Sequence, residues 1–278
     1  MHQGKEGTMR ESMPPRAGRK TMVEVRQVTK RYQAQGRRQA GGAATQALDG
    51  VSFAVAEGEF VGIMGPSGSG KSTLLNCLAT IDAPTSGSIA IGGVDITRLA
   101  GKQLARFRRD DLGFIFQDSN LLDTLTAFEN IALALTIQKA PVREIDARVN
   151  AAARQLGIHE VLGSYPYQLS GGQRQRVAAA RATITHPKLV LADEPTGALD
   201  SKSARQLLES LTVLNRAGAT ILMVTHDATS ASYCERIMFI KDGRLSGELR
   251  RGAADRAAFY RSIADAVSGM GEAMADAC

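Results

Sequence analysis

The segment from Gly65 to Thr73 has the residue types and the spacing of a phosphate-binding loop. It reads Gly-Pro-Ser-Gly-Ser-Gly-Lys-Ser-Thr and matches the pattern G-x-x-x-x-G-K-[ST]. The apolar run 59–64 before it predicts a buried strand, and the residues from Ser72 predict a helix. Glycines allow successive backbone N–H groups to point at a phosphate, and the positive end of the helix dipole adds to the attraction. A glycine-rich turn before a helix is the alternative interpretation.

The loop predicts ATP and Mg²⁺ as ligands. Lys71 is expected to reach the β- and γ-phosphates, and the Ser72 hydroxyl is expected to bind Mg²⁺. The predicted phosphate-binding residues are Gly65, Pro66, Ser67, Gly68, Ser69, Gly70, Lys71, Ser72 and Thr73.

Two carboxylates and a histidine follow two further apolar runs. Asp193 and Glu194 follow the run 189–192, and His226 comes shortly after the run 219–224. Ligands of open α/β sheets bind at the carboxyl ends of the strands, so these side chains are expected at one edge of a sheet. Asp193 is predicted to hold the Mg²⁺ shell, and Glu194 to orient and deprotonate the attacking water. His226 is predicted to hydrogen-bond the γ-phosphate.

Composition excludes several classes of protein. The sequence contains no run of 18 apolar residues, so it predicts no membrane span. It also contains no recognisable signal peptide, so a cytosolic protein is expected. The net charge of +6 comes from residues 1–38, which carry ten Lys/Arg and three Glu. The nearly neutral remainder is not typical of a nucleic-acid groove. The spacing of the three cysteines, Cys77, Cys234 and Cys278, does not fit a metal site. We expect them to be reduced thiols, with Cys77 in the core.

Periodicity outlines the remaining elements. We expect an edge strand at Val23–Tyr32, a surface loop at Gln33–Thr45, a strand at Val51–Val55, and helices at Glu144–Leu156 and Ala204–Leu214. A last helix from Ala253 carries Phe259, Ile263, Val267 and Met270 on one stripe, for core packing or docking. Residues 1–21 predict a disordered basic tail, with contact to anionic lipid as the alternative interpretation, and Met22 is an alternative translation start.

From about Val23 to about Gly247 the chain resembles the ATP-binding subunits of ABC transporters. Five further segments carry the resemblance: Tyr32, Gln117 in Phe-Ile-Phe-Gln-Asp, the signature Leu169–Gln173, Asp200 in Ala-Leu-Asp, and His226. The resemblance implies that Tyr32 contacts adenine, that Gln117 senses Mg²⁺ and the γ-phosphate, and that two subunits pair head to tail around two ATP molecules. Each ATP would then contact Lys71 of one subunit and the signature of the other, with Ser170, Gly171, Gly172 and Gln173 at the start of a helix. The resemblance also implies that Asp200 is a nucleotide-binding residue.

The resemblance also implies the fold class and the domains. We expect an α/β P-loop NTPase (RecA-like) core with an antiparallel β subdomain and an inserted α-helical subdomain. The predicted ATPase domain covers residues 22–250, with its helical subdomain at about 118–185, and residues 251–278 form the C-terminal helix.

The segment from Arg108 to Thr126 resembles one branch of the family, which serves macrolide export, lipoprotein release and antimicrobial-peptide resistance. Residues 120–126 are most similar to the bacitracin-resistance type. This similarity implies a separate permease with a large extracytoplasmic domain and a place on the inner face of the membrane. Phe116, Leu121 and Leu122 are expected near the permease groove or in the core of the helical lobe. A lipoprotein-release or cell-division ATPase is the alternative within the branch, and a soluble ABC ATPase acting on ribosomes or DNA is the alternative outside it.

Overall fold

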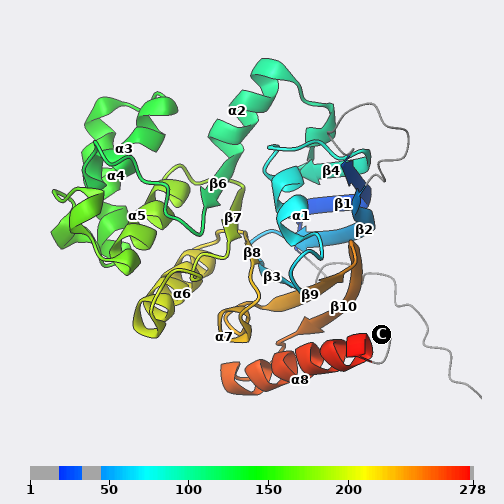
Figure 1. The fold of residues 1–278 in the computed structure, drawn as a ribbon. Helices are drawn as coiled ribbons and strands as arrows, with labels where there is room; N and C mark the ends of the chain where they lie inside the picture. Colours follow the sequence, from blue (N-terminus) through cyan, green and yellow to red (C-terminus); the bar gives the residue numbers. More distant parts are fainter. Residues whose placement is uncertain (1–18, 33–44, 276–278) are drawn as a thin grey trace, which may run out of the picture.

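A computed structural model describes residues 19–32 and 45–275, arranged as two sheets with helices around them (Figure 1). The larger sheet has the strand order β10-β9-β3-β8-β7-β6, in which only β10 runs antiparallel to its neighbour. Its strands are β3 (Phe60–Met64), β6 (Leu112–Ile115), β7 (Leu189–Asp193), β8 (Ile221–Val224), β9 (Arg236–Lys241) and β10 (Arg244–Arg250). The smaller sheet is antiparallel, in the order β2-β1-β4-β5, with β1 (Thr21–Tyr32), β2 (Thr45–Ala56), β4 (Ser86–Ile91) and β5 (Val94–Asp95).

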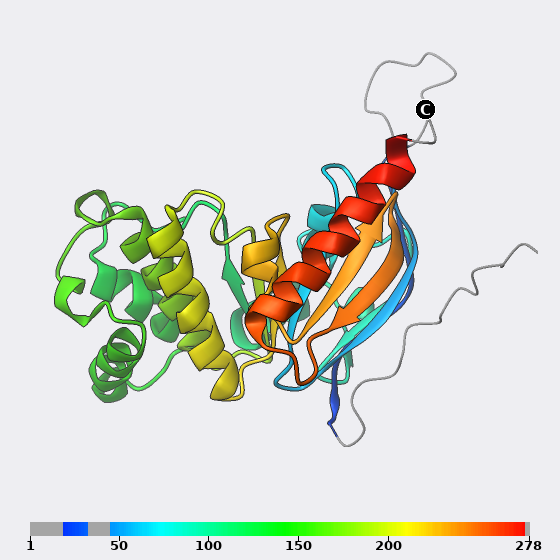
Figure 2. The same cartoon turned by 90° about the horizontal axis from the view of Figure 1, so that it is seen from below.

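Eight α-helices lie in the described part of the chain. They are α1 (Lys71–Leu78), α2 (Gly101–Asp111), α3 (Ala127–Ile137), α4 (Val142–Gln155), α5 (Gly171–Thr183), α6 (Ser201–Arg216), α7 (Ala228–Ala231) and α8 (Arg256–Ala275). Of three short 3₁₀ turns, Ile96–Arg98 lies between β5 and α2, and His159–Val161 and Pro166–Gln168 lie between α4 and α5. Helices α3, α4 and α5 gather on the side of the large sheet away from β1 and β2 (Figures 1 and 2). None of the described helices is long and apolar enough to cross a membrane.

The inner strands of the large sheet are buried on both faces, which explains their continuous apolar sequences. Alternate residues of β3 enter two different cores. Val61 and Ile63 pack with α1 and the small sheet, whereas Phe60 and Met64 pack with the helices on the other face. Cys77 belongs to the first core, as predicted, and burial raises the pKa of its thiol to about 11.

The mixed α/β fold with one parallel and one antiparallel sheet confirms the predicted fold class. The prediction that Val23–Tyr32 forms an edge strand is wrong, because β1 pairs with β2 on one side and with β4 on the other. In α8, which lies along β10 (Figure 2), Phe259 and Ile263 are buried while Val267 is exposed. Residues 1–18 of the predicted tail, nearly all of the predicted loop 33–45, and Cys278 lie outside the described residues.

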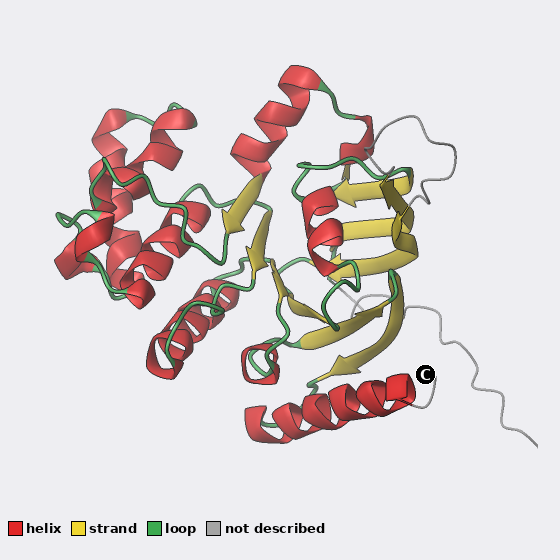
Figure 3. Cartoon of the chain, in the orientation of Figure 1, coloured by secondary structure: helices red, strands yellow, loops and turns green. Residues whose placement is uncertain are grey.

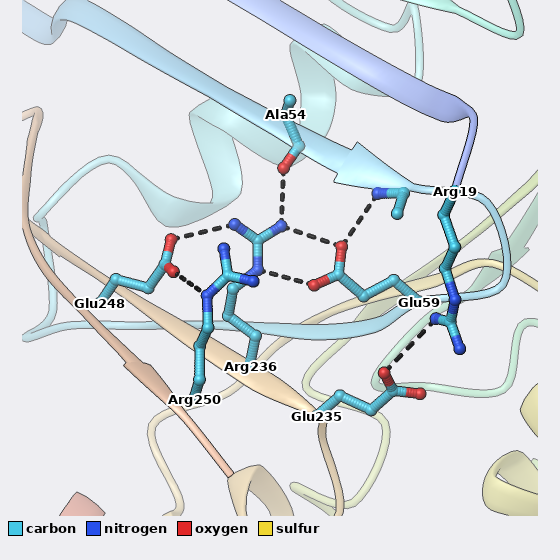
Figure 4. Close-up of polar contacts among 8 residues, drawn as sticks. Arg19, Ala54, Glu59, Glu235, Arg236, Glu248 and Arg250 are labelled. Carbon is cyan, nitrogen blue, oxygen red and sulfur yellow. Dashed lines mark hydrogen bonds and ion pairs between the residues drawn. The ribbon is translucent and has the colours of Figure 1, made fainter. Parts of the chain in front are cut away.

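A buried arginine connects the two sheets (Figure 4). The Arg236 side chain on β9 donates to both carboxylate oxygens of Glu59, at 2.8 and 3.0 Å. It also donates to Glu248 on β10 at 2.9 Å and to the Ala54 carbonyl on β2 at 2.6 Å. Because Arg236 is only 1% exposed, its charge is stabilised by these partners in place of water.

Replacement of Arg236 by alanine should therefore lower the free energy of unfolding by about 3–5 kcal/mol, since it leaves the Glu59 carboxylate buried without its partner. Urea denaturation measures the change. The matched control is Arg244→Ala, which removes an exposed arginine paired with Asp49 and should cost at most about 1 kcal/mol. Equal losses from the two substitutions would contradict the assigned role of Arg236.

Candidate active site

The predicted phosphate loop joins β3 to α1 and lies at the carboxyl edge of the large sheet (Figure 3). Gly70 has a φ of 102°, and a Cβ on it would lie 2.4 Å from the Ala47 carbonyl oxygen. A Cβ on Gly65 would lie 2.0 Å from the Ile240 carbonyl oxygen. Other residues are therefore excluded at these two positions, because the backbone on either side leaves no space for a side chain.

The loop curls around the ammonium group of Lys71. The Lys71 Nζ donates to the carbonyl oxygens of Gly65 and Pro66, each at 2.8 Å, and the residue is 8% exposed. Burial lowers its pKa, while the charges of Glu194 and Asp193 oppose that shift. Lys71 is thus a buried cation close to two carboxylates.

The other loop residues divide into an exposed and a buried group. Pro66, Ser67, Gly68 and Ser72 are exposed, while Gly65, Gly70 and Thr73 are half-buried. Ser69 is buried, and its hydroxyl oxygen has no hydrogen-bond partner in the described part of the chain. The exposed serines and backbone lie where a ligand can reach them from solvent.

Parallel pairing brings the two carboxylates and His226 to the same edge as the loop. Val224 at the end of β8 is in register with Ile63 of β3 and with Asp193 of β7. Beyond the strands, Thr225 N–H donates to the Ile63 carbonyl at 3.1 Å, and Glu194 N–H donates to the Val224 carbonyl at 2.9 Å. The sequence prediction that these segments meet is confirmed.

Glu194 and His226 contact each other directly. The His226 Nδ1 lies 2.9 Å from the Glu194 Oε1, and Glu194 has a left-handed backbone φ of 42°. Burial raises the pKa of the adjacent Asp193, the Glu194 charge raises it further, and Lys71 opposes both. The Asp193 carboxylate and the Glu194 carboxylate, which lies beside the His226 imidazole, therefore lie together at the end of β7.

Gln117 follows β6 and lies beside the segment after Glu194. Its amide nitrogen is 3.2 Å from the position that a Cβ on Gly197 would occupy, and Gly197 N–H donates to the Glu194 carbonyl at 2.9 Å. The backbone of Gln117 is held by Gln175 of α5, whose side-chain amide donates to the carbonyls of Phe116, at 2.9 Å, and Gln117.

Gln175 was not predicted as a site residue. It is 2% exposed and stands two residues before Val177 and the alanines of α5. A polar side chain in such a buried helix face is the one signal that sequence inspection offers, because buried polar groups need hydrogen-bond partners.

The signature forms the N-terminus of α5. Ser170 is the N-cap, its hydroxyl accepts from Gln173 N–H at 3.2 Å, and the Gln173 side chain accepts from Ser170 N–H at 2.8 Å. A Cβ on Gly172 would lie 2.7 Å from the Cβ of Ser203, so the contact between α5 and α6 requires a glycine there. Gly171, like Gln173, is half-buried, and Ser170 is exposed.

The signature and the phosphate loop of one chain lie apart. Helix α5 belongs to the helical group on one side of the large sheet, whereas α1 lies against the small sheet on the other side (Figures 1 and 2). No hydrogen bond joins the two segments among the described residues. The structure therefore does not bring Ser170 to the site built around Lys71.

Tyr32 and Asp200 lie at the ends of their own elements. Tyr32 ends β1, the residue is 40% exposed, and its hydroxyl donates to Asp82 at 2.8 Å. Asp200 is the N-cap of α6 and accepts from Lys202 N–H and Ser203 N–H, each at 3.0 Å. Hydrogen bonding to Ser203 holds the pKa of Asp200 below its usual value. The predicted contacts of both residues with nucleotide stay predictions.

A model of one protein family, described as ABC transporter, matches residues 48–197. This range contains the phosphate loop, the signature and both carboxylates. The chain belongs to the ABC transporter family. It is an ATP-binding subunit and an ATPase, as the motifs predicted.

Two relatives place this ABC subunit in its branch. It is 53% identical over 219 residues to the bacitracin export ATP-binding protein BceA of Halalkalibacterium halodurans, covering 78% of this chain and 87% of the relative. It is 41% identical over 242 residues to the macrolide export ATP-binding/permease protein MacB of Hyphomonas neptunium, covering 86% of this chain and 37% of the longer relative.

A solved structure has the same fold. It is the ATP-binding cassette MJ0796 of Methanocaldococcus jannaschii, described as a dimeric post-hydrolysis state bound to ADP and Pi. The match has a TM-score of 0.73 and 40% sequence identity, and it covers 82% of this chain and 98% of the other.

The position of Lys71 leads to a prediction about binding. Lys71→Ala should weaken ATP binding about 10- to 100-fold, because a hydrogen bond to a charged group contributes about 1.5–3 kcal/mol. Calorimetric titration measures the dissociation constant. Lys188→Ala is the control, since Lys188 pairs with Asp111 and immediately precedes β7, at the opposite edge of the sheet. Unchanged ATP affinity in Lys71→Ala would exclude a phosphate contact.

Proposed function

We propose that this ABC subunit binds two ATP molecules between two copies of itself and drives a separate membrane permease of the macrolide-export and bacitracin-export type. The observation that carries the pairing is the separation of α5, whose N-cap is Ser170, from α1, which begins at Lys71, within one chain (Figure 1). An exposed helix N-terminus attracts anions, so a second copy can present its Ser170 to a phosphate held by the first. The dimeric form of the structural neighbour supports this arrangement.

In the proposed reaction, the loop residues and Lys71 bind the triphosphate and Glu194 accepts a proton from the attacking water. The short contact between Glu194 and His226 supports these roles, because it fixes the carboxylate beside a group that can donate to the γ-phosphate. Gln117, attached to α5 through Gln175, connects the site with the helical group.

Three side chains fit Mg²⁺ by their chemistry. Ser72, Gln117 and Asp193 provide a hydroxyl, an amide and a carboxylate oxygen, and Mg²⁺ prefers oxygen ligands. The described residues contain no group of three or more His, Cys, Asp or Glu that would hold a metal ion by itself. The three residues would therefore bind the ion together with phosphate oxygens, where it neutralises phosphate charge.

The proposed partner is a permease with a large extracytoplasmic domain, and the proposed role is export of, or resistance to, antimicrobial peptides at the inner face of the cell membrane. The 53% identity to a bacitracin export protein supports this role over lipoprotein release or cell division. The ligand itself is recognised by the permease. Leu122 is exposed, whereas Leu121 and Phe116 are half-buried, so Leu122 is available for contact with that partner.

Glu194→Gln should reduce ATP turnover about 10²- to 10⁴-fold, the usual contribution of a general base, and leave ATP binding intact. Phosphate release and ATP titration measure the two quantities separately. Glu209→Gln, the same change on an exposed face of α6, is the control and should retain normal turnover. Near-normal turnover in Glu194→Gln would remove Glu194 from the reaction.

The Glu194→Gln protein also tests the partner. When it is purified with ATP from detergent-solubilised membranes of its host, a permease with a large extracytoplasmic domain should copurify. The double variant Glu194→Gln/Lys71→Ala, purified in the same way, should recover less permease, because ATP-dependent pairing strengthens the proposed complex. Recovery of ribosomes or DNA-bound proteins instead would contradict the transporter role and leave the ATPase chemistry unaffected.

A further inference from the structure

The Tyr32 ring is held by two charged residues from different elements. Its hydroxyl donates to Asp82 Oδ2 at 2.8 Å. The Lys30 ammonium donates to the other carboxylate oxygen at 2.5 Å and lies 4.9 Å from the centre of the Tyr32 ring. Lys30 and Tyr32 come from β1, whereas Asp82 lies between α1 and β4. The three side chains thus form one cluster, which we name the Tyr32 support, and the Tyr32 side chain also hydrogen-bonds the side chain of Thr73 in the phosphate loop.

The segment that carries Asp82 is fixed to β1 and to α1. Lys30 also donates to the Ala83 carbonyl at 2.8 Å, and Thr85 N–H donates to the Thr29 carbonyl at 2.7 Å. Asp82 N–H donates to the Asn76 carbonyl of α1 at 3.2 Å. Since α1 begins at Lys71, these contacts fix the distance between the Tyr32 ring and the phosphate loop.

The charges in the Tyr32 support favour an ionised Asp82 and a neutral Tyr32. Burial of the Asp82 carboxyl works to raise its pKa, but the hydrogen bonds from Lys30 and Tyr32 outweigh burial, so that the pKa falls below its usual value. Burial and the hydrogen bond to Asp82 raise the pKa of Tyr32. At neutral pH an ionised Asp82 therefore accepts from a protonated tyrosine.

We propose that Asp82 is a positioning residue for recognition of the nucleotide base. It holds the Tyr32 ring in place, with the Lys30 cation over one face and the other face available for stacking on a purine. The 40% exposure of Tyr32 leaves ring surface for this contact. The inference rests on the proposed binding of ATP and on the predicted contact of Tyr32 with adenine. It assigns base affinity to the Tyr32 support and phosphate affinity to the loop.

The test compares ATP with inorganic tripolyphosphate, which has no base. Tyr32→Ala should weaken ATP binding about 5- to 100-fold, the range for loss of one base–aromatic stack. Asp82→Ala should weaken it about 2- to 10-fold, and Asp82→Asn less, because asparagine retains an acceptor for the Tyr32 hydroxyl. Tripolyphosphate affinity should not change in the two Asp82 variants.

The control is Asp123→Ala, an exposed aspartate before α3, which should bind ATP normally. Asp82→Ala added to Tyr32→Ala should cause no further loss, because the support has no ring left to position. If Tyr32→Ala leaves ATP affinity unchanged, the proposed base contact is wrong and the inference falls with it. If Tyr32→Ala weakens ATP binding but Asp82→Ala does not, or if Asp82→Ala weakens tripolyphosphate equally, the inference alone is overturned.

Discussion

The parallel pairing of β7, β8 and β3 is the constraint on which the site depends. Because the three strands end in register, the phosphate loop, Asp193 with Glu194, and the segment carrying His226 all leave the sheet at one edge. The same sheet therefore positions all of these groups. The chemistry therefore rests on main-chain hydrogen bonds between strands whose side chains are almost wholly buried, which makes the edge rigid.

The groups around this edge differ in how firmly they are attached to it. Arg236 joins the small sheet to the large one through buried charged hydrogen bonds, so the small sheet, which carries Tyr32, and the phosphate loop belong to one body. The helical group is connected to the site through Gln175 and the backbone of Gln117. A shift of α5, which also carries the signature, would consequently move Gln117. In the proposed dimer, this connection would link the site to the second subunit and to the proposed permease.

Local features of the site were predictable from the sequence, and distant contacts were not. The order of strand, loop and helix around Lys71 follows from residue spacing, and the apolar runs before Asp193 and His226 mark strand ends. The alternation in β1 indicates a strand but says nothing about its neighbours, so its central place was missed. Gln175 lies 58 residues from Gln117, whose carbonyl it binds, and Asp82 lies 50 residues from Tyr32, whose hydroxyl it binds. Local sequence patterns do not predict contacts over such separations.

The central claim is that each ATP site uses the signature of a second copy. Mixing Lys71→Ala with Ser170→Asp tests it, because aspartate retains the N-cap of α5 while its charge repels phosphate, and Ser170→Asn is the neutral control. Each variant alone should be inactive, whereas the mixture should regain ATPase activity, since each heterodimer contains one site with an intact loop and an intact signature. No recovery in heterodimers whose formation has been verified would contradict the account.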